Sequence, residues 1–180
     1  MTSGSYSAQT KFQAAFVETR DLSYFMLSAT LPLVIILGLL LLTSIGGKPL
    51  GYLSLAGGIV VLIALLKLLH DLVYDIAGYP DYKMPVWTVL YSILYIIEGF
   101  TFLFFGLHLV SPSAHYTGIA TGMGAAFLDS LYLSLARTFA IPPEASFQAK
   151  SQVARFLPVI QGGLVMFLNI VIITKFVTAF

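Results

Sequence analysis

The chain has 180 residues, of which 58% are hydrophobic and 9% are charged, with a mean hydropathy of +0.93 and a formal net charge of +1. A soluble domain carries about 25% charged residues, so this composition excludes a water-soluble protein and predicts an all-α integral membrane protein that contacts the lipid bilayer. The near-zero charge gives no reason to expect a nucleic-acid partner. The absence of cysteine excludes disulfides and thiolate chemistry.

Residues 1–25 form a polar segment of mixed charge, without the basic start and short apolar run of a signal peptide. Within it, residues 11–25 place apolar side chains at helical spacing, which predicts a helix lying on the membrane surface. The first predicted crossing covers about 26–45, inside a run without Asp, Glu, Lys or Arg. A crossing needs about 20 apolar residues, and this segment supplies them.

The second predicted crossing runs from about 52 to 75, after the turn GGKPLG at 46–51, so residues 26–75 read as a two-helix hairpin. A third crossing, about 86–110, follows the polar loop AGYPDYKMP at 77–85. A fourth covers about 156–180.

Ionisable residues interrupt the second and third crossings. Lys67, His70 and Asp71 fall on one face of the second helix, and Glu98 lies near the middle of the third. Charges inside a membrane helix are costly and indicate function or pairing. Three roles are open: a structural pairing of the two helices, a proton or ion pathway, or sensing. Lys67 and Asp71 have the spacing of an i, i+4 ion pair, Glu98 is within reach of Lys67 in antiparallel packing, and Asp75 is expected to be solvated.

The apolar segment 127–139 has thirteen residues, too few for a crossing, and is predicted to enter the membrane and return to the same face. The fold prediction is therefore four transmembrane helices with a re-entrant segment between the third and fourth. An even number of crossings places both termini on one side, and the distribution of Lys and Arg favours the cytoplasm.

Residues 86–180 resemble the pore module of potassium-channel-like proteins, in the order outer helix, pore helix, inner helix. The segment DSLYLSL (129–135) is similar to a pore helix that follows an acidic residue, and ARFLPVIQGGLVMFLNIVIITKFV (154–177) is similar to the inner helix. The resemblance implies a pore helix bearing Asp129, Tyr132 and Arg137, an inner-helix bend at Gly162 and Gly163, and a homo-oligomer, with a tetramer favoured.

The filter of that family is missing. Where a potassium channel carries TVGYG, this chain has Ala140, Ile141, Pro142, Pro143 and Glu144. Stacked filter carbonyls need glycines at positive φ, whereas proline fixes φ near −65°, so a potassium filter is excluded. Two interpretations stay open: a ring of Glu144 carboxylates that favours cations, or a plug or docking surface in a protein that does not conduct.

Other polar positions add little to the prediction. Asn169, deep in the last crossing, needs a partner in hydrocarbon, either its own copies around an axis or another subunit. The glycines at 56–58 and at 162–163 are expected to allow close helix packing. No motif for catalysis, a cofactor or a metal is apparent, so an enzyme is not expected.

The leading functional hypothesis is an ion-channel-like membrane protein with an altered filter, forming a weakly selective cation pathway. The alternatives are a non-conducting structural or assembly subunit of a larger membrane complex, and a small proton-coupled transporter using Lys67, Asp71 and Glu98.

Overall fold

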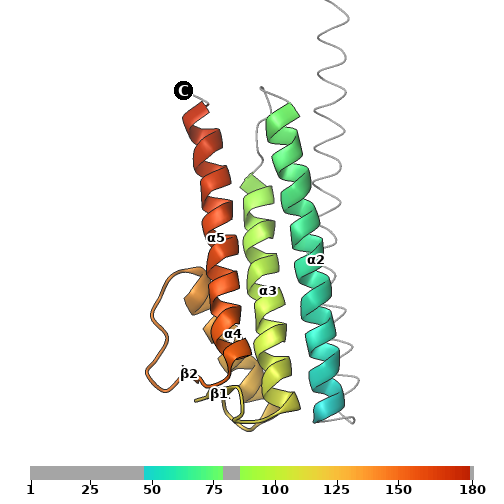
Figure 1. Cartoon of the computed structure of the whole chain (residues 1–180), viewed down its shortest axis with the longest axis vertical. Helices are drawn as coiled ribbons and strands as arrows, with labels where there is room; N and C mark the ends of the chain where they lie inside the picture. Colours follow the sequence, from blue (N-terminus) through green and yellow to red (C-terminus); the bar gives the residue numbers. More distant parts are fainter. Residues whose placement is uncertain (1–46, 79–85, 179–180) are drawn as a thin grey trace, which may run out of the picture.

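The computed structural model describes residues 47–78 and 86–178. In chain order its elements are α2 (Lys48–Gly78), α3 (Val86–Val110), β1 (Tyr116–Thr117), α4 (Met123–Thr138), β2 (Gln148–Ala149) and α5 (Gln152–Thr178). The three long helices run side by side, and the short α4 lies at the end of the bundle that also holds the two strands (Figure 1). The predicted surface helix at 11–25, the first crossing at 26–45 and most of the loop at 77–85 lie outside the described residues.

Three helices of the described part are long and apolar enough to cross a membrane: α2, residues Thr88–Val110 of α3, and residues Gln152–Thr174 of α5. They correspond to the second, third and fourth predicted crossings. The structure therefore supports the predicted class, an α-helical membrane protein.

The helix starts differ from the sequence prediction for local reasons. Helix α2 begins at Lys48, inside the predicted turn, because Gly47 adopts a φ of +88° and Pro49 suits the first turn of a helix. Helix α5 begins at Gln152, four residues earlier than predicted. Ser151 precedes it, and its Oγ accepts a hydrogen bond of 3.1 Å from the amide of Ala154, the geometry of an N-cap. Hydrophobicity alone did not reveal either start.

Glycines bring α2 and α3 into close antiparallel contact. A Cβ atom built on Gly106 would lie 2.8 Å from the carbonyl oxygen of Gly51, and one on Gly58 would lie 2.8 Å from that of Gly99. Such distances leave no room for a side chain, so the two backbones approach directly. The Ser54 hydroxyl also donates to the carbonyl of Phe102 at 2.8 Å. Close packing was predicted for the glycines at 56–58, and Gly58 confirms it.

The apolar core is centred on α3, whose aromatic side chains reach both neighbours. Phe104 packs edge-on against Tyr116 of β1, with ring centroids 5.5 Å apart, and Phe105 packs in the same way against Phe127 of α4, also at 5.5 Å. Edge-to-face pairs of this kind add to the burial of apolar area. They attach the strands and α4 to one end of the α2–α3 pair.

Candidate functional site

The two short strands join the ends of the segment that contains α4. They pair antiparallel, with Tyr116 opposite Ala149 and Thr117 opposite Gln148, and the amide of Lys150 donates to the carbonyl of His115 at 2.9 Å. Chain positions on either side of α4 are therefore held together. The segment leaves this end of the bundle and comes back to it (Figure 1).

A proline in α5 helps to fix β1 against that helix. Pro158 has no backbone N–H, so it cannot donate to the carbonyl of Ala154 four residues earlier. The Tyr116 hydroxyl donates to that carbonyl instead, at 3.0 Å. Burial raises the pKa of the Tyr116 hydroxyl well above its usual range, against a smaller opposing effect of Arg137, so the hydroxyl keeps its proton as a donor. Sequence reasoning missed this contact, although the position of Pro158 marks the free carbonyl.

Helix α4 begins earlier than the sequence indicated. It starts at Met123 after an extended Gly122, so Asp129 lies in its second turn and does not precede the helix as expected. The Asp129 Oδ2 atom accepts a hydrogen bond of 2.8 Å from the amide of Ala120. Asp129 thus fixes the backbone at Ala120, just before α4, to the second turn of that helix.

The other end of α4 lies level with the middle of α3. The Ser134 hydroxyl donates to the carbonyl of Ile97 at 2.8 Å, and Ile97 is near the centre of α3. From α5, the fully buried Gln161 donates through Nε2 to the Ser134 carbonyl and to Thr138 Oγ1, each at 2.9 Å. These bonds fix the depth of α4 in the bundle.

A line of buried hydroxyls on α4 makes these contacts possible. Ser130, Ser134 and Thr138 are four residues apart and therefore share one face of the helix. This i, i+4 spacing is visible in the sequence and indicates a polar face of the helix. The Oε1 atom of Gln161 is buried beside them without a hydrogen-bond partner.

Amides that follow α4 hydrogen bond to the last carbonyls of this helix. The amide of Ile141 donates to the carbonyl of Ala136 at 2.7 Å, the amide of Ala140 to that of Arg137 at 3.4 Å, and Ala140 adopts a φ of +54°. This is a Schellman motif, with alanine where glycine is usual. Because these carbonyls are occupied, they do not point freely beyond the helix end.

The segment 139–147 that returns from α4 is largely exposed. Ala140, Ile141, Pro142 and Glu144 are exposed and Pro143 is partly buried. The return is held to α4 by Phe147, whose ring centroid lies 5.7 Å from that of Tyr132.

A glycine allows this segment to pass close to the strand end. Gly118 has a φ of +86°, and a Cβ atom on it would lie 2.5 Å from the carbonyl oxygen of Ser146. Only glycine fits such a conformation and approach without strain. The residues predicted as a filter therefore form the exposed tip of a loop that is fixed at both ends.

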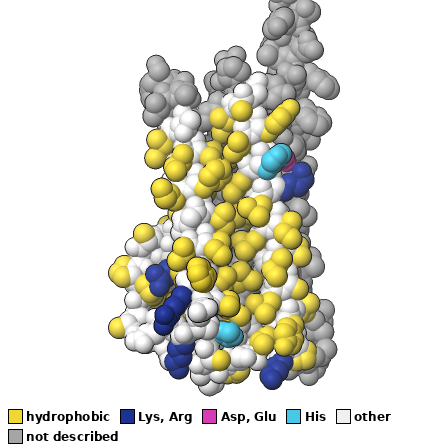
Figure 2. Space-filling model, viewed as in Figure 1, with side chains coloured by type: hydrophobic (Ala, Val, Ile, Leu, Met, Phe, Trp, Pro, Cys, Tyr) yellow, Lys and Arg dark blue, Asp and Glu magenta, His cyan; other side chains and the backbone are white. Residues whose placement is uncertain are grey.

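Basic side chains gather at this end of the molecule, beside α4, the strands and the start of α5 (Figure 2). Arg137, Lys150 and Arg155 are all exposed. No ion pair joins Arg137 to Glu144 in the part of the chain that the structure describes. Glu144 is thus an exposed carboxylate.

The charges predicted inside α2 form one cluster. Lys67 Nζ lies 3.3 Å from Asp71 Oδ2, which confirms the ion pair predicted from their spacing, and His70 Nδ1 lies 3.4 Å from Asp71 Oδ1. The Lys67 and His70 side chains are 65% and 79% exposed, so this cluster lies on the outer surface of the helix pair. Asp75, expected to be solvated, is only 2% exposed, and that expectation was wrong.

Glu98 lies apart from these charges. Among the described residues, its buried Oε2 atom has no hydrogen-bond partner and Glu98 forms no ion pair with Lys67. An ionised carboxylate buried without a compensating charge costs several kcal/mol. A partner for the Oε2 atom of Glu98 would therefore have to come from outside the described contacts.

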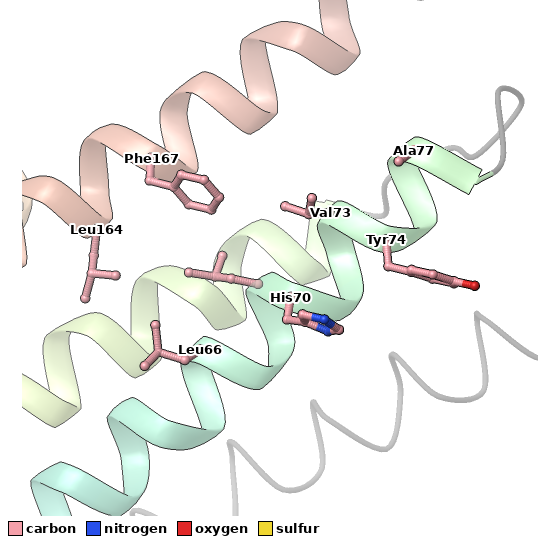
Figure 3. A pocket seen from close by; sticks show the side chains of 8 residues that line it. Leu66, His70, Val73, Tyr74, Ala77, Leu164 and Phe167 are labelled. Carbon is pink, nitrogen blue, oxygen red and sulfur yellow. The ribbon is translucent and has the colours of Figure 1, made fainter.

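A shallow apolar groove of about 570 Å³ separates α2 from α5. In Figure 3, Val73 of α2 and Phe167 of α5 point toward the space between the helices, while the Tyr74 ring points away from α5. His70 and Tyr74 are the ionisable residues in its lining. The groove has the character of a lipid-facing crevice and lacks a convergent set of polar groups.

Within the described ranges, no group of three or more His, Asp or Glu side chains could hold a metal ion. Comparison with models of protein families, with curated proteins and with solved structures finds no match. The class of this protein, an α-helical membrane protein, thus rests on its own sequence and structure. The likeness of residues 86–180 to a potassium-channel pore module stays a prediction.

Proposed function

We propose that this protein is a channel-like homo-oligomer in which α4 and the loop 139–147 enter the bilayer from one face and return to it. The observation that carries the proposal is the β1–β2 pairing, which holds the two ends of this segment together while Ser134 reaches the level of Ile97. Helix α4 has 16 residues, about 24 Å, and the hydrocarbon core is about 30 Å thick. A helix shorter than the hydrocarbon core, with a fixed return, is the layout of a pore loop.

The chemistry of the loop favours weak cation selectivity. Pro142 and Pro143 exclude a stack of filter carbonyls, and the Schellman motif occupies the carbonyls of Ala136 and Arg137. The exposed carboxylate of Glu144 is the group left to interact with a cation. Repeated around an axis, four such side chains would form an acidic ring, a known basis of cation preference that does not distinguish closely similar ions.

The test is ion flux through purified protein in liposomes. Wild-type protein is expected to pass monovalent cations with little preference between Na⁺ and K⁺, and Glu144→Gln is expected to reduce the ratio of cation to anion permeability severalfold. Lys150→Gln is the matched control, since it removes an exposed charge next to β2 and should leave that ratio higher or unchanged. Absence of flux in wild type over a range of pH and voltage would overturn the proposal.

A second function, a non-conducting assembly subunit, is favoured by the exposed Arg137 in the last turn of α4. A guanidinium near the tip of a pore helix repels cations, and the same group suits a carboxylate on another protein. Native mass measurement after mild extraction separates the two functions. A ring containing this chain alone supports the channel, and stable foreign subunits with an electrically silent protein support the assembly role.

A further inference from the structure

One side of α5 packs against no other residue that the structure describes. Val159, Met166 and Ile173 are seven residues apart and are 68%, 65% and 60% exposed. Gly162 and Asn169 lie between them, also seven residues apart and also exposed. The alternating steps of three and four residues place all five on one stripe, the spacing by which two helices pack along their length. We call these five residues the α5 seam.

Contact of the seam with lipid alone would leave the Asn169 amide in an unfavourable environment. It lies six residues, about 9 Å, beyond Gly163 at the midpoint of the apolar stretch Gln152–Thr174, well within a hydrocarbon half-thickness of about 15 Å. Its side chain is exposed, and it makes no hydrogen bond to any residue that the structure describes. A primary amide in hydrocarbon requires a donor and an acceptor from outside the helix.

The glycines of α5 differ in kind from those of α2 and α3. A Cβ atom on Gly162 or on Gly163 would meet nothing within 4 Å. The close packing predicted for this pair is therefore not made with any residue that the structure describes. On the seam, Gly162 leaves a gap one turn from Met166, into which a facing helix could fit.

From these observations we propose that the α5 seam is the surface through which two copies of this chain associate, with parallel α5 helices in contact. A second copy is the occupant because the seam is self-complementary: an amide both donates and accepts, so Asn169 satisfies Asn169 at the same depth in two copies inserted alike. The flexible Met166 side chain packs over the facing Gly162. This inference rests on the homo-oligomer that the proposed function requires, and it names the surface involved.

The seam is distinct from the other surfaces of α5. Gln161 is buried against α4 and lies about 100° around the helix from Gly162, so the α4 contact is separate from the seam. Phe167 lines the groove toward α2 and lies about 100° around the helix from Met166. The apolar groove therefore stays open to lipid when the seam is covered.

Single-cysteine cross-linking in membranes tests the seam, and the chain offers a background with no cysteine. Met166→Cys and Ile173→Cys are expected to form disulfide-linked dimers on mild oxidation. Ile160→Cys is the control, because Ile160 is 51% exposed yet lies about 120° around the helix from Met166. Equal cross-linking at Ile160 and Met166 would contradict the proposal.

Two neighbouring glycines give a sharper test. Gly162→Leu is expected to lower cross-linking at Met166→Cys at least tenfold, whereas Gly163→Leu leaves it within twofold. A Cβ atom at either position meets none of the described residues within 4 Å, so both variants should fold. Asn169→Leu is expected to weaken association about threefold to tenfold. Equal effects of the two leucines would overturn the seam.

The outcome is separate from that of the flux experiment. If the seam cross-links but the protein passes no ions, the proposed contact between copies is supported and the proposed channel function is rejected. If the protein passes ions but cross-links at Ile160 and not at Met166, the proposed channel function is supported and the proposed contact through the seam is rejected.

Discussion

The α2–α3 pair and the α4–α5 half of this protein are held together by different means. In the first, the most apolar 18-residue stretches of α3 and α2 are 67% and 33% buried, and glycines let the two backbones touch. In the second, the corresponding stretch of α5 is 11% buried, and hydroxyl and amide side chains make the contacts to α4. The first is a completed helix pair. The second leaves the loop 139–147 and the α5 seam exposed, so these surfaces are open to ions or to a second copy of the chain.

The largest effect should come from adding a methyl group to the completed pair. In Gly106→Ala the new Cβ atom would meet the carbonyl of Gly51 and the amide of Leu55 at 2.8 and 2.9 Å, and backbone atoms cannot rotate away. We expect a loss of about 3 kcal/mol in the free energy of unfolding, the upper end for overpacking. Thermal unfolding in detergent measures it.

Gly163→Ala is the matched control in the other half. Its Cβ atom meets nothing, and alanine is a better helix former than glycine by up to about 1 kcal/mol. Its stability should be unchanged or higher. If both variants were destabilised equally, the contrast between the two halves would fail.

The next effect concerns the carbonyl that Pro158 leaves free. Tyr116→Phe removes the donor to the buried Ala154 carbonyl and should cost about 2 kcal/mol. In a Pro158→Ala background, the new N–H at 158 can donate to that carbonyl, so the same change should cost less than about 0.5 kcal/mol. A double-mutant cycle by chemical denaturation checks this. Equal costs in the two backgrounds would show that Pro158 does not create the need for Tyr116.

The polar contact between α4 and α5 should give a smaller effect. Gln161→Met keeps the length of the side chain but removes the bonds to Ser134 and Thr138, and it also removes the unpartnered Oε1. We expect a net loss of about 1 kcal/mol and faster hydrogen exchange in the last turns of α4. Gln152→Met, at an exposed position, is the control. Unchanged exchange in α4 would mean that its depth is fixed by other contacts.

The smallest effect should come from the surface charges of α2. Lys67→Met breaks an i, i+4 ion pair whose lysine is 65% exposed, and such pairs are worth about 0.5 kcal/mol or less. Thermal unfolding should therefore move little, and ion flux should not change. A large loss of flux in this variant would point instead to the proton-coupled transporter that the sequence left open.

Hydrophobic length predicted the long helices well, because apolar runs of sufficient length have few other structures available in a bilayer. It misplaced the starts of α4 and α5, since those are set by the extended Gly122 and by the Ser151 cap. The backbone approach at Gly58 was readable because small residues have one main use between membrane helices.

Long-range contacts were much harder to predict. The β1–β2 pairs join residues about 30 positions apart across a segment without strand-like alternation, and no local pattern announces them. The roles of Asp129 and Gln161 depend on which backbone groups the fold brings near them. The i, i+4 spacing of Ser130, Ser134 and Thr138 and the proline at 158 were visible signals that could have indicated polar contacts of α4 and a free carbonyl in α5.

The most direct test of the account is the sidedness of the segment around α4. Single cysteines at Ala114 and Gln148, both exposed beside the strands, would be labelled in sealed vesicles with a membrane-impermeant thiol reagent. Cysteines at Lys48 and Ala77, near the opposite ends of α2, mark the two faces of the membrane. The account predicts that Ala114 and Gln148 react from the same face as Lys48 and that Ala77 reacts from the other. Labelling of Ala114 and Gln148 from opposite faces would contradict it.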